Sequence, residues 1–105
     1  MSEFVFVYRA PTDYQGSLAT AAAWERWFNS LGTSLLDKGN PVFVRSTHGN
    51  GGADTGLGGY SLIAADNLDA AAALAKGCPI VDSGGGVEIG ELTPVPGRHH
   101  PARTY

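Results

Sequence analysis

The sequence is poor in charged residues and in cysteine, and these shortages exclude several classes of protein. Only 16% of its 105 residues are Asp, Glu, Lys or Arg, against an average of about 25% in soluble domains. Seven Lys and Arg residues are outnumbered by ten Asp and Glu, so no basic surface favours a nucleic acid partner. The single cysteine, Cys78, excludes an intrachain disulfide framework and a cysteine-based zinc site.

Long apolar runs are also missing. None approaches the roughly 20 residues that cross a bilayer. The N-terminal sequence MSEFVFVYR has an acid before its apolar stretch and no basic start, a pattern that favours a strand over a signal peptide. We therefore expect a soluble, cytoplasmic single domain with no membrane partner, since 105 residues suffice for one hydrophobic core.

Hydrophobic periodicity predicts a strand and then a long helix in the first third of the chain. The strand, over Glu3–Arg9, alternates aromatic residues with valines. The helix is predicted over Leu18–Lys38 with Ser17 as its N-cap. Its large apolar residues recur at spacings of three and four and are expected to be mainly core: Trp24, Trp27, Phe28, Leu31 and Leu35.

Glycines and prolines divide the rest of the chain into short elements. Strands are predicted over Val42–Ser46 and Gly59–Ala65, joined by a glycine-rich loop that starts at His48. A second helix capped by Asp66 follows, and a last strand is predicted over Val87–Leu92.

This order of elements, β-α-β-β-α-β, predicts an α+β protein with the ferredoxin-like arrangement, an antiparallel sheet with two helices on one face. In the first strand the aromatic residues Phe4, Phe6 and Tyr8 share one face. Val5 and Val7 share the other, and no further element remains to cover them. We therefore expect a homodimer, in which a second copy covers this apolar face.

The second half of the chain carries a specific series of motifs. The run LGGYSLIAADNLDAAAALAKGCPIVDSGGGVEIGEL combines a Gly-Gly-Tyr strand, an Ala-Asp-x-Leu-Asp-Ala helix start, a Cys-Pro pair and a glycine-rich turn before a Val-Glu strand. In this order the motifs resemble the YCII-related (DGPF-domain) proteins. The helix with Trp24 and Trp27 and its exit LGTSLLDKGNPV is similar to the first helix of that family. The resemblance identifies residues 1–94 as a YCII-related domain and leaves residues 95–105 as a Pro-rich C-terminal tail.

The resemblance implies a dimeric α+β barrel, in which two ferredoxin-like sheets pack face to face, with a cavity between the first helix and the sheet. It also implies a sigma-factor-type protein partner, because some members lie beside or are fused to extracytoplasmic-function sigma factors. Two family features are missing here. The interval HGNGGADTG stands where the Asp-Gly-Pro-Phe signature is found, and the first helix has no histidine for the Asp-His dyad proposed in other members. The resemblance therefore transfers a fold but no catalytic residue.

His48 is the candidate acid/base residue of the chain. It stands at the start of the glycine-rich loop, with Asp54 six residues later. A carboxylate beside an imidazole fixes its tautomer and raises its basicity. The alternative is that both residues are solvated parts of a polar loop.

Residues at the ends of the first two predicted strands are candidate ligand-binding residues: Tyr8, Arg9, Arg45 and Ser46. If these strand ends are neighbours, they form a cationic rim suited to a carboxylate or phenolate. The alternative is that the two arginines pair with Glu88 or Glu91 across the sheet. The Trp24 indole is a further candidate, because it could line the cavity that the family resemblance implies.

No cofactor or metal is expected. Cys78 has no cation beside it in the sequence, so we expect a buried apolar residue rather than a nucleophile. His99 and His100 stand in the Pro-rich tail, where flexibility is a simpler explanation than a metal site. The glycine-rich stretches lack the Gly-Lys-Ser/Thr of a phosphate loop.

Two functions remain open. The first is a dimeric ligand- or partner-binding module, tied to transcriptional regulation by family analogy. The alternative is a cofactor-independent enzyme acting on a small anionic or aromatic molecule, with His48 as acid/base and Arg45 or Arg9 holding the anion. A His48 side chain that faces a cavity near Asp54 or Asp13 would support the enzyme, and a solvent-facing one would support binding.

Overall fold

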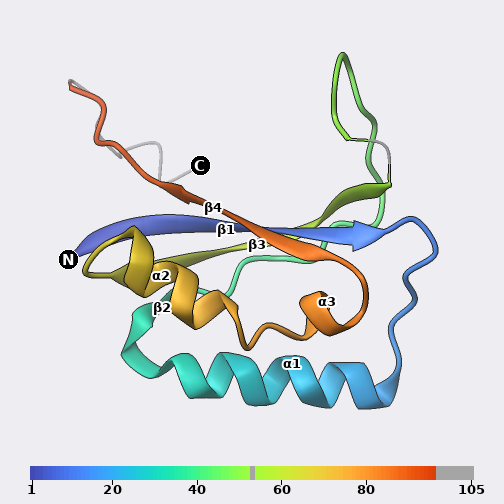
Figure 1. Cartoon of the computed structure of the whole chain (residues 1–105), viewed down its shortest axis with the longest axis horizontal. Helices are drawn as coiled ribbons and strands as arrows, with labels where there is room; N and C mark the ends of the chain where they lie inside the picture. The colour runs from blue at the N-terminus through green and yellow to red at the C-terminus, as the bar shows by residue number, and fades with distance from the viewer. Residues whose placement is uncertain (53, 97–105) are drawn as a thin grey trace, which may run out of the picture.

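One antiparallel sheet with helices on a single face forms the described part of the chain, residues 1–52 and 54–96 of a computed structural model (Figure 1). The strand order is β2-β3-β1-β4, and every neighbouring pair is antiparallel. This is the predicted ferredoxin-like α+β fold. The elements in chain order are β1 (Ser2–Pro11), α1 (Leu18–Leu31), the 3₁₀ helix η1 (Gly32–Ser34), β2 (Leu35–Asp37), β3 (Thr55–Ala65), α2 (Leu68–Ala75), α3 (Pro79–Asp82) and β4 (Gly86–Glu91).

The central strand β1 carries the core. Its aromatic residues face the helices as predicted: Phe4 and Phe6 are fully buried, and Tyr8 is 5% exposed. Phe6 stacks on Trp27 of α1 with ring centroids 6.4 Å apart. The predicted helical stripe is therefore joined to the sheet through aromatic contacts, which add to the hydrophobic burial.

The helix α1 is shorter than predicted. Ser17 is its N-cap, as expected, and forms a capping box in which the Ser17 and Thr20 side chains accept from each other's backbone N–H. The helix ends at Leu31 and not at Lys38, because Gly32 adopts a φ of 55° that the helix cannot continue through.

The second strand also differs from the prediction. β2 begins at Leu35, which pairs with Ile63 of β3 and packs against the core. The helical prediction failed here because the spacing of Leu35 from Leu31 fits a helix and says nothing of the glycine turn between them. The prediction of a strand over Val42–Ser46 was likewise wrong.

Residues 38–46, called here the edge segment, follow the outer edge of β3 without forming a strand. Pro41 makes an isolated bridge with Gly59, and the Val42 N–H donates to the Gly58 carbonyl at 3.1 Å. Beyond that point the chain leaves the sheet, and Phe43 is 84% exposed. β3 continues along this edge to Thr55, but the edge segment forms no pairing with it after Val42, so strand propensity alone did not decide the structure here.

The second half of the fold follows the prediction more closely. β3 begins at Thr55, four residues before the predicted start, and β4 lies within one residue of its predicted bounds. The N-cap of α2 is Asn67 and not Asp66, because the Asn67 side chain accepts from the Ala70 N–H at 2.8 Å. The short helix α3 was not predicted, although Pro79 occupies its first turn as helix starts favour.

The sheet face opposite the helices is not covered by any helix or strand of the described residues (Figure 1). We call it the open face. Val5 pairs with Leu62 and Val7 with Tyr60 across β1 and β3, so the face is apolar at its centre. The loop after the edge segment rises on this side of the sheet (Figure 1).

Two sequence predictions fall partly beyond the described part of the chain. His99, His100 and most of the predicted tail lie outside the described residues. Among the helices that are described, none is both long enough and apolar enough to cross a membrane.

Candidate functional site

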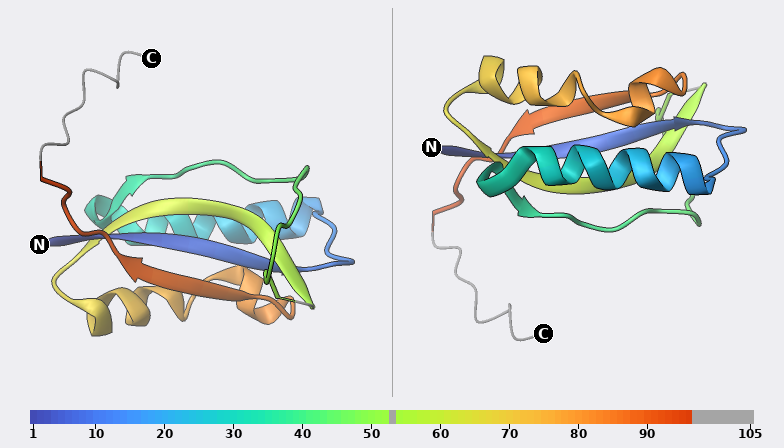
Figure 2. Two further views of the ribbon diagram at one scale, coloured as in Figure 1. Left: turned by 90° about the horizontal axis from the view of Figure 1, so that it is seen from above. Right: turned by 90° about the horizontal axis from the view of Figure 1, so that it is seen from below.

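A cleft of about 800 Å³ lies on the helix side of the sheet, between α1 and the edge segment. Seen from below, α1 runs between the pair α2–α3 and the edge segment (Figure 2), so one flank of α1 is packed and the other borders the cleft. The volume is within the range of small-molecule sites. Aromatic residues supply much of the lining on this side of the sheet: Tyr8, Tyr14, Trp24, Phe28 and Phe43.

Gly39 fixes the wall of the cleft that the edge segment forms. Its φ is 72°, and a Cβ at this position would overlap the Tyr60 carbonyl. The Gly39 N–H donates to the Asp37 carboxylate at 2.8 Å, which holds the turn. Only glycine allows this approach, so the cleft depends on one backbone position that carries no side chain.

Two indoles of α1 have different surroundings. Trp27 is 6% exposed, and its Nε1–H donates to the Leu74 carbonyl at 3.1 Å, so it belongs to the core. Trp24 is half-buried and lines the cleft. Its ring meets the Tyr8 ring edge-to-face at 4.8 Å, and its Nε1–H donates to the Tyr14 hydroxyl at 3.3 Å. Trp24 is thus fixed in orientation while one side stays accessible.

A chain of hydrogen bonds runs from the Tyr8 hydroxyl, as its first donor, to the Lys38 carbonyl. Tyr8 donates to the Ser61 hydroxyl at 2.7 Å, and Ser61 donates to the Lys38 carbonyl at 2.7 Å. Ser61 is fully buried. Burial raises the pKa of the Tyr8 hydroxyl far above its ordinary value, and the bond to Ser61 offsets part of that rise. Tyr8 is therefore a neutral phenol at any physiological pH.

Two cationic side chains belong to the lining, Lys38 and Arg45. The Lys38 ammonium pairs with Glu25 at 3.1 Å and lies 5.2 Å from the centre of the Phe28 ring. Because both partners are exposed, the ion pair adds little stability. Arg45 has no ion pair in the described part of the chain, so its charge is available at the cleft.

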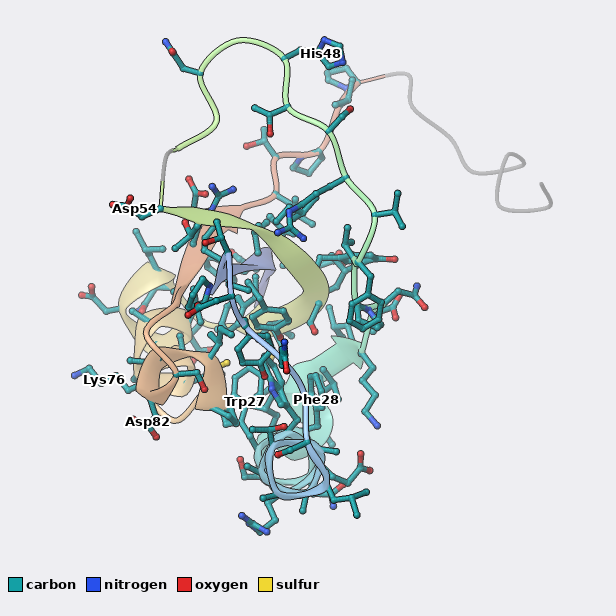
Figure 3. The ribbon with its side chains drawn as sticks, turned by 90° about the vertical axis from the view of Figure 1, so that its right-hand side faces the viewer. Trp27, Phe28, His48, Asp54, Lys76 and Asp82 are labelled. Carbon is teal, nitrogen blue, oxygen red and sulfur yellow. The ribbon has the colours of Figure 1, made fainter. Side chains whose placement is uncertain are left out.

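The predicted pair His48 and Asp54 is not assembled in this structure. Both side chains are exposed, neither lines the cleft, and no hydrogen bond joins them among the described residues. Figure 3 shows His48 out on the loop, distant from Trp27 and Phe28, with Asp54 at the other end of the loop. Asp13 is also exposed and outside the lining.

The predicted cationic rim is only partly formed. Arg9 donates to the Gly51 carbonyl at 2.6 Å and to the Thr55 carbonyl at 3.1 Å, so it braces the glycine-rich loop. It lies outside the cleft, as does the exposed Ser46. The structure brings together three of the candidate ligand residues: Tyr8, Trp24 and Arg45. In the described residues the alternative pairing of the two arginines with Glu88 or Glu91 is absent as well.

Sequence reasoning missed several residues of the lining. Lys38 was assigned to the end of a helix, and Tyr14 and Asn40 to connections without a role, yet all three line the cleft. For Lys38 and Asn40, the sequence signal that could have indicated a site is the run Lys38-Gly39-Asn40-Pro41. A glycine there fits a close backbone approach as well as it fits a helix stop.

The site offers no metal-binding cluster. No group of three or more His, Cys, Asp or Glu side chains comes together in residues 1–52 and 54–96. Cys78 is 1% exposed, as predicted for a buried apolar residue, and burial raises the pKa of its thiol to about 12. The chemical groups of the cleft are hydroxyls, aromatic rings, the Glu25 carboxylate and the two cations.

Comparison with known proteins identifies a fold but no family. No protein-family model matches the chain, and no curated protein matches its sequence. The fold is similar to that of 5-chloro-2-hydroxyhydroquinone dehydrochlorinase from Burkholderia phenoliruptrix AC1100, solved in complex with 2,5-dihydroxybenzoquinone. The TM-score is 0.57 at 17% identity, over 88% of this chain and 95% of the dehydrochlorinase. The two proteins share the ferredoxin-like α+β architecture.

Proposed function

We propose that the chain is a homodimeric, YCII-related protein that binds a small aromatic molecule in the cleft between α1 and the edge segment. The observation that carries this proposal is the lining. A cleft of about 800 Å³ combines aromatic residues with a buried hydroxyl and two cations. Apolar walls with a few placed polar groups are typical of small-molecule sites.

The side chains of the cleft suit a flat ring with a polar substituent. Trp24 and Phe28 have ring centroids 5.7 Å apart and form one aromatic wall. Aromatic rings gain about 0.5–1.5 kcal/mol from offset or edge-to-face contact beyond their burial. Arg45 adds a guanidinium that pairs well with a carboxylate or phenolate. A small aromatic molecule with an anionic group at one end therefore fits both the aromatic wall and the Arg45 guanidinium.

The placement of His48 favours binding over acid–base catalysis. The imidazole is exposed and outside the cleft lining, and a general base must lie within hydrogen-bond reach of the proton that it removes. The likeness to a dehydrochlorinase keeps one alternative in view, a cofactor-independent enzyme acting on a small aromatic ring. In that alternative His48 remains the residue that we propose as acid/base.

Replacing His48 by Gln separates these two functions. For a binding protein, His48→Gln leaves ligand affinity and thermal stability unchanged, because the side chain is exposed and makes no contact with the cleft. For an enzyme, the same change lowers turnover by roughly 10²–10⁴-fold, the usual contribution of general acid–base catalysis. Affinity by calorimetry and turnover by product analysis, measured on one preparation, decide between them.

Family membership is supported by two independent features. The motif series from Leu57 to Leu92 resembles the YCII-related proteins in the order of its motifs, and the ferredoxin-like fold is the one that this resemblance implied. The homodimer is supported by the open face, where Val5, Val7 and Leu62 are only half-buried and no helix or strand of the described chain covers them.

The proposed site is tested by placing a larger side chain in the cleft. Ala21 and Ala22 are both exposed residues of α1, but only Ala21 lines the cleft. Small molecules released from the purified protein are identified by mass spectrometry, and their affinity is then measured for Ala21→Phe and Ala22→Phe. We expect Ala21→Phe to weaken binding by at least about tenfold, because one buried ring excludes another. Equal binding by the two variants would show that the ligand lies elsewhere.

A further inference from the structure

The direction of the hydrogen-bond chain at Tyr8 decides which polar group the cleft accepts. A carbonyl oxygen only accepts, so the bond between Ser61 and the Lys38 carbonyl uses the one proton of the Ser61 hydroxyl. The Ser61 oxygen must then accept from Tyr8, as the 2.7 Å contact between them shows. The Tyr8 proton is therefore engaged inside the protein.

The Tyr8 oxygen keeps a lone pair that no protein group of the described chain uses. No donor from the described residues reaches the Tyr8 hydroxyl, while Tyr8 itself lines the cleft. Its phenol is held in place by an edge-to-face contact with Trp24 and by burial of its ring. Tyr8 also keeps its proton, because burial raises the pKa of its hydroxyl, so that proton stays on the bond to Ser61. At this point the cleft is a fixed acceptor.

Building on the proposed function, we propose that the ligand is an aromatic molecule that donates a hydrogen bond to the Tyr8 oxygen, through a phenol O–H or an aromatic N–H. A quinone carbonyl, a phenolate or a carboxylate is disfavoured there, because two acceptors would face each other without a proton. Anionic groups of the same ligand belong at the other polar position, beside Arg45. The Tyr8 oxygen and the Arg45 guanidinium thus determine the orientation of the ligand as well as its chemical class.

Three fluorinated probes of similar size test the polarity. 4-Fluorophenol carries a donor, 4-fluorotoluene carries neither donor nor acceptor in the same position, and 4-fluoroacetophenone carries only an acceptor. Affinities are measured by ¹⁹F NMR titration on the full chain. For the wild-type chain we expect 4-fluorophenol to bind about 3- to 10-fold more tightly than 4-fluorotoluene, the usual worth of one hydrogen bond.

Two variants and one control assign the effect to the chain of hydroxyls. Tyr8→Phe should abolish the preference for the phenol. Ser61→Ala frees the Tyr8 proton and should raise the affinity for 4-fluoroacetophenone by about 3- to 10-fold. Ser30→Ala removes a hydroxyl that donates to the Trp27 carbonyl, lies outside the cleft lining and takes no part in the chain of hydroxyls, so it should change neither result. Circular dichroism confirms that each variant is folded.

The outcomes separate this inference from the proposed function. If all three probes bind the wild-type chain with a ratio that neither variant changes, the donor requirement is wrong, and the aromatic cleft stands. If none of the probes binds the wild-type chain, both proposals are wrong. A phenol preference lost in Tyr8→Phe, with a gain for the ketone in Ser61→Ala, establishes the fixed acceptor.

Discussion

At the residue scale, the two tryptophans of α1 have different roles although they lie within a single turn of the helix. Trp27 is buried and bonded to the backbone of α2, whereas Trp24 keeps an accessible side at the cleft. One spacing pattern placed both on the same helical stripe. Which tryptophan lines the cleft depends on the path of the edge segment. The spacing of residues along α1 does not predict that path.

Trp27→Ala should destabilise the protein by about 3–5 kcal/mol, the usual loss for a large aromatic residue in a packed core. Trp24→Ala should have a smaller effect, because part of its ring contacts no protein atoms. Urea unfolding of the two variants measures the difference. A Trp27→Ala variant as stable as the parent would show that the aromatic cluster around Phe6 is not the core of the fold.

Cys78 makes stability depend on pH in the alkaline range. Burial raises the pKa of its thiol to about 12, above the value of about 8.5 for an unfolded chain. As the pH rises, the unfolded state loses the proton first, so the stability that is complete below about pH 8.5 is lost progressively toward pH 12. The free energy of unfolding of Cys78→Ala should therefore fall less steeply above pH 8.5. Parallel curves for parent and variant would contradict a buried thiol.

At the element scale, β3, α2 and β4 were predictable, whereas α3 and the path between α1 and β3 were not. Alternation in β1 and the small-residue helix α2 are local patterns that one sequence carries in full. The short β2 depends on pairing between Leu35 and Ile63, which is a tertiary contact. The path of the edge segment could not be predicted for the same reason, and Lys38 and Asn40 were therefore missed as lining residues.

Gly39→Ala should damage both the fold and the cleft. Its left-handed backbone costs a residue with a side chain about 1–2 kcal/mol, and the overlap with the Tyr60 carbonyl adds to that loss. Gly86→Ala is the control, since its Cβ would meet open space and its φ is not positive. We expect Gly39→Ala to lower the urea midpoint and weaken probe binding, while Gly86→Ala does neither. A Gly39→Ala variant that binds normally would show that the wall adapts.

At the scale of the whole molecule, the fold could be predicted because it follows from element order, whereas the site could not. Tyr8 and Arg45 were singled out from the sequence for a rim that also held Arg9, and Trp24 for the cavity that the family resemblance implies. Adjacent residues of a strand face opposite sides of the sheet, so Tyr8 and Arg9 could not both reach one site. A cleft between distant segments is a property of packing, which residue types alone do not specify.

The open face predicts the mass of the particle in solution. Val5 and Val7 are half-buried in the single chain, and a second copy would bury their remaining apolar surface at roughly 25 cal/mol per Å². Sedimentation equilibrium at micromolar concentration should therefore give twice the chain mass of 10.9 kDa. Val7→Glu should dissociate the particle, and Val81→Glu, at an exposed position of α3, should not. A wild-type chain that sediments at 10.9 kDa would contradict the dimer.

The aromatic cleft is tested most directly by the two indole N–H resonances of the protein, one for each tryptophan. Both are observed in one ¹H–¹⁵N spectrum and assigned with Trp24→Phe. Titration with 4-fluorophenol should shift the Trp24 indole resonance saturably and the Trp27 resonance much less, because Trp24 lines the cleft and Trp27 bonds to Leu74 in the core. A Trp24 resonance that stays unchanged at saturating probe, or that moves no more than the Trp27 resonance, would contradict ligand binding at this cleft.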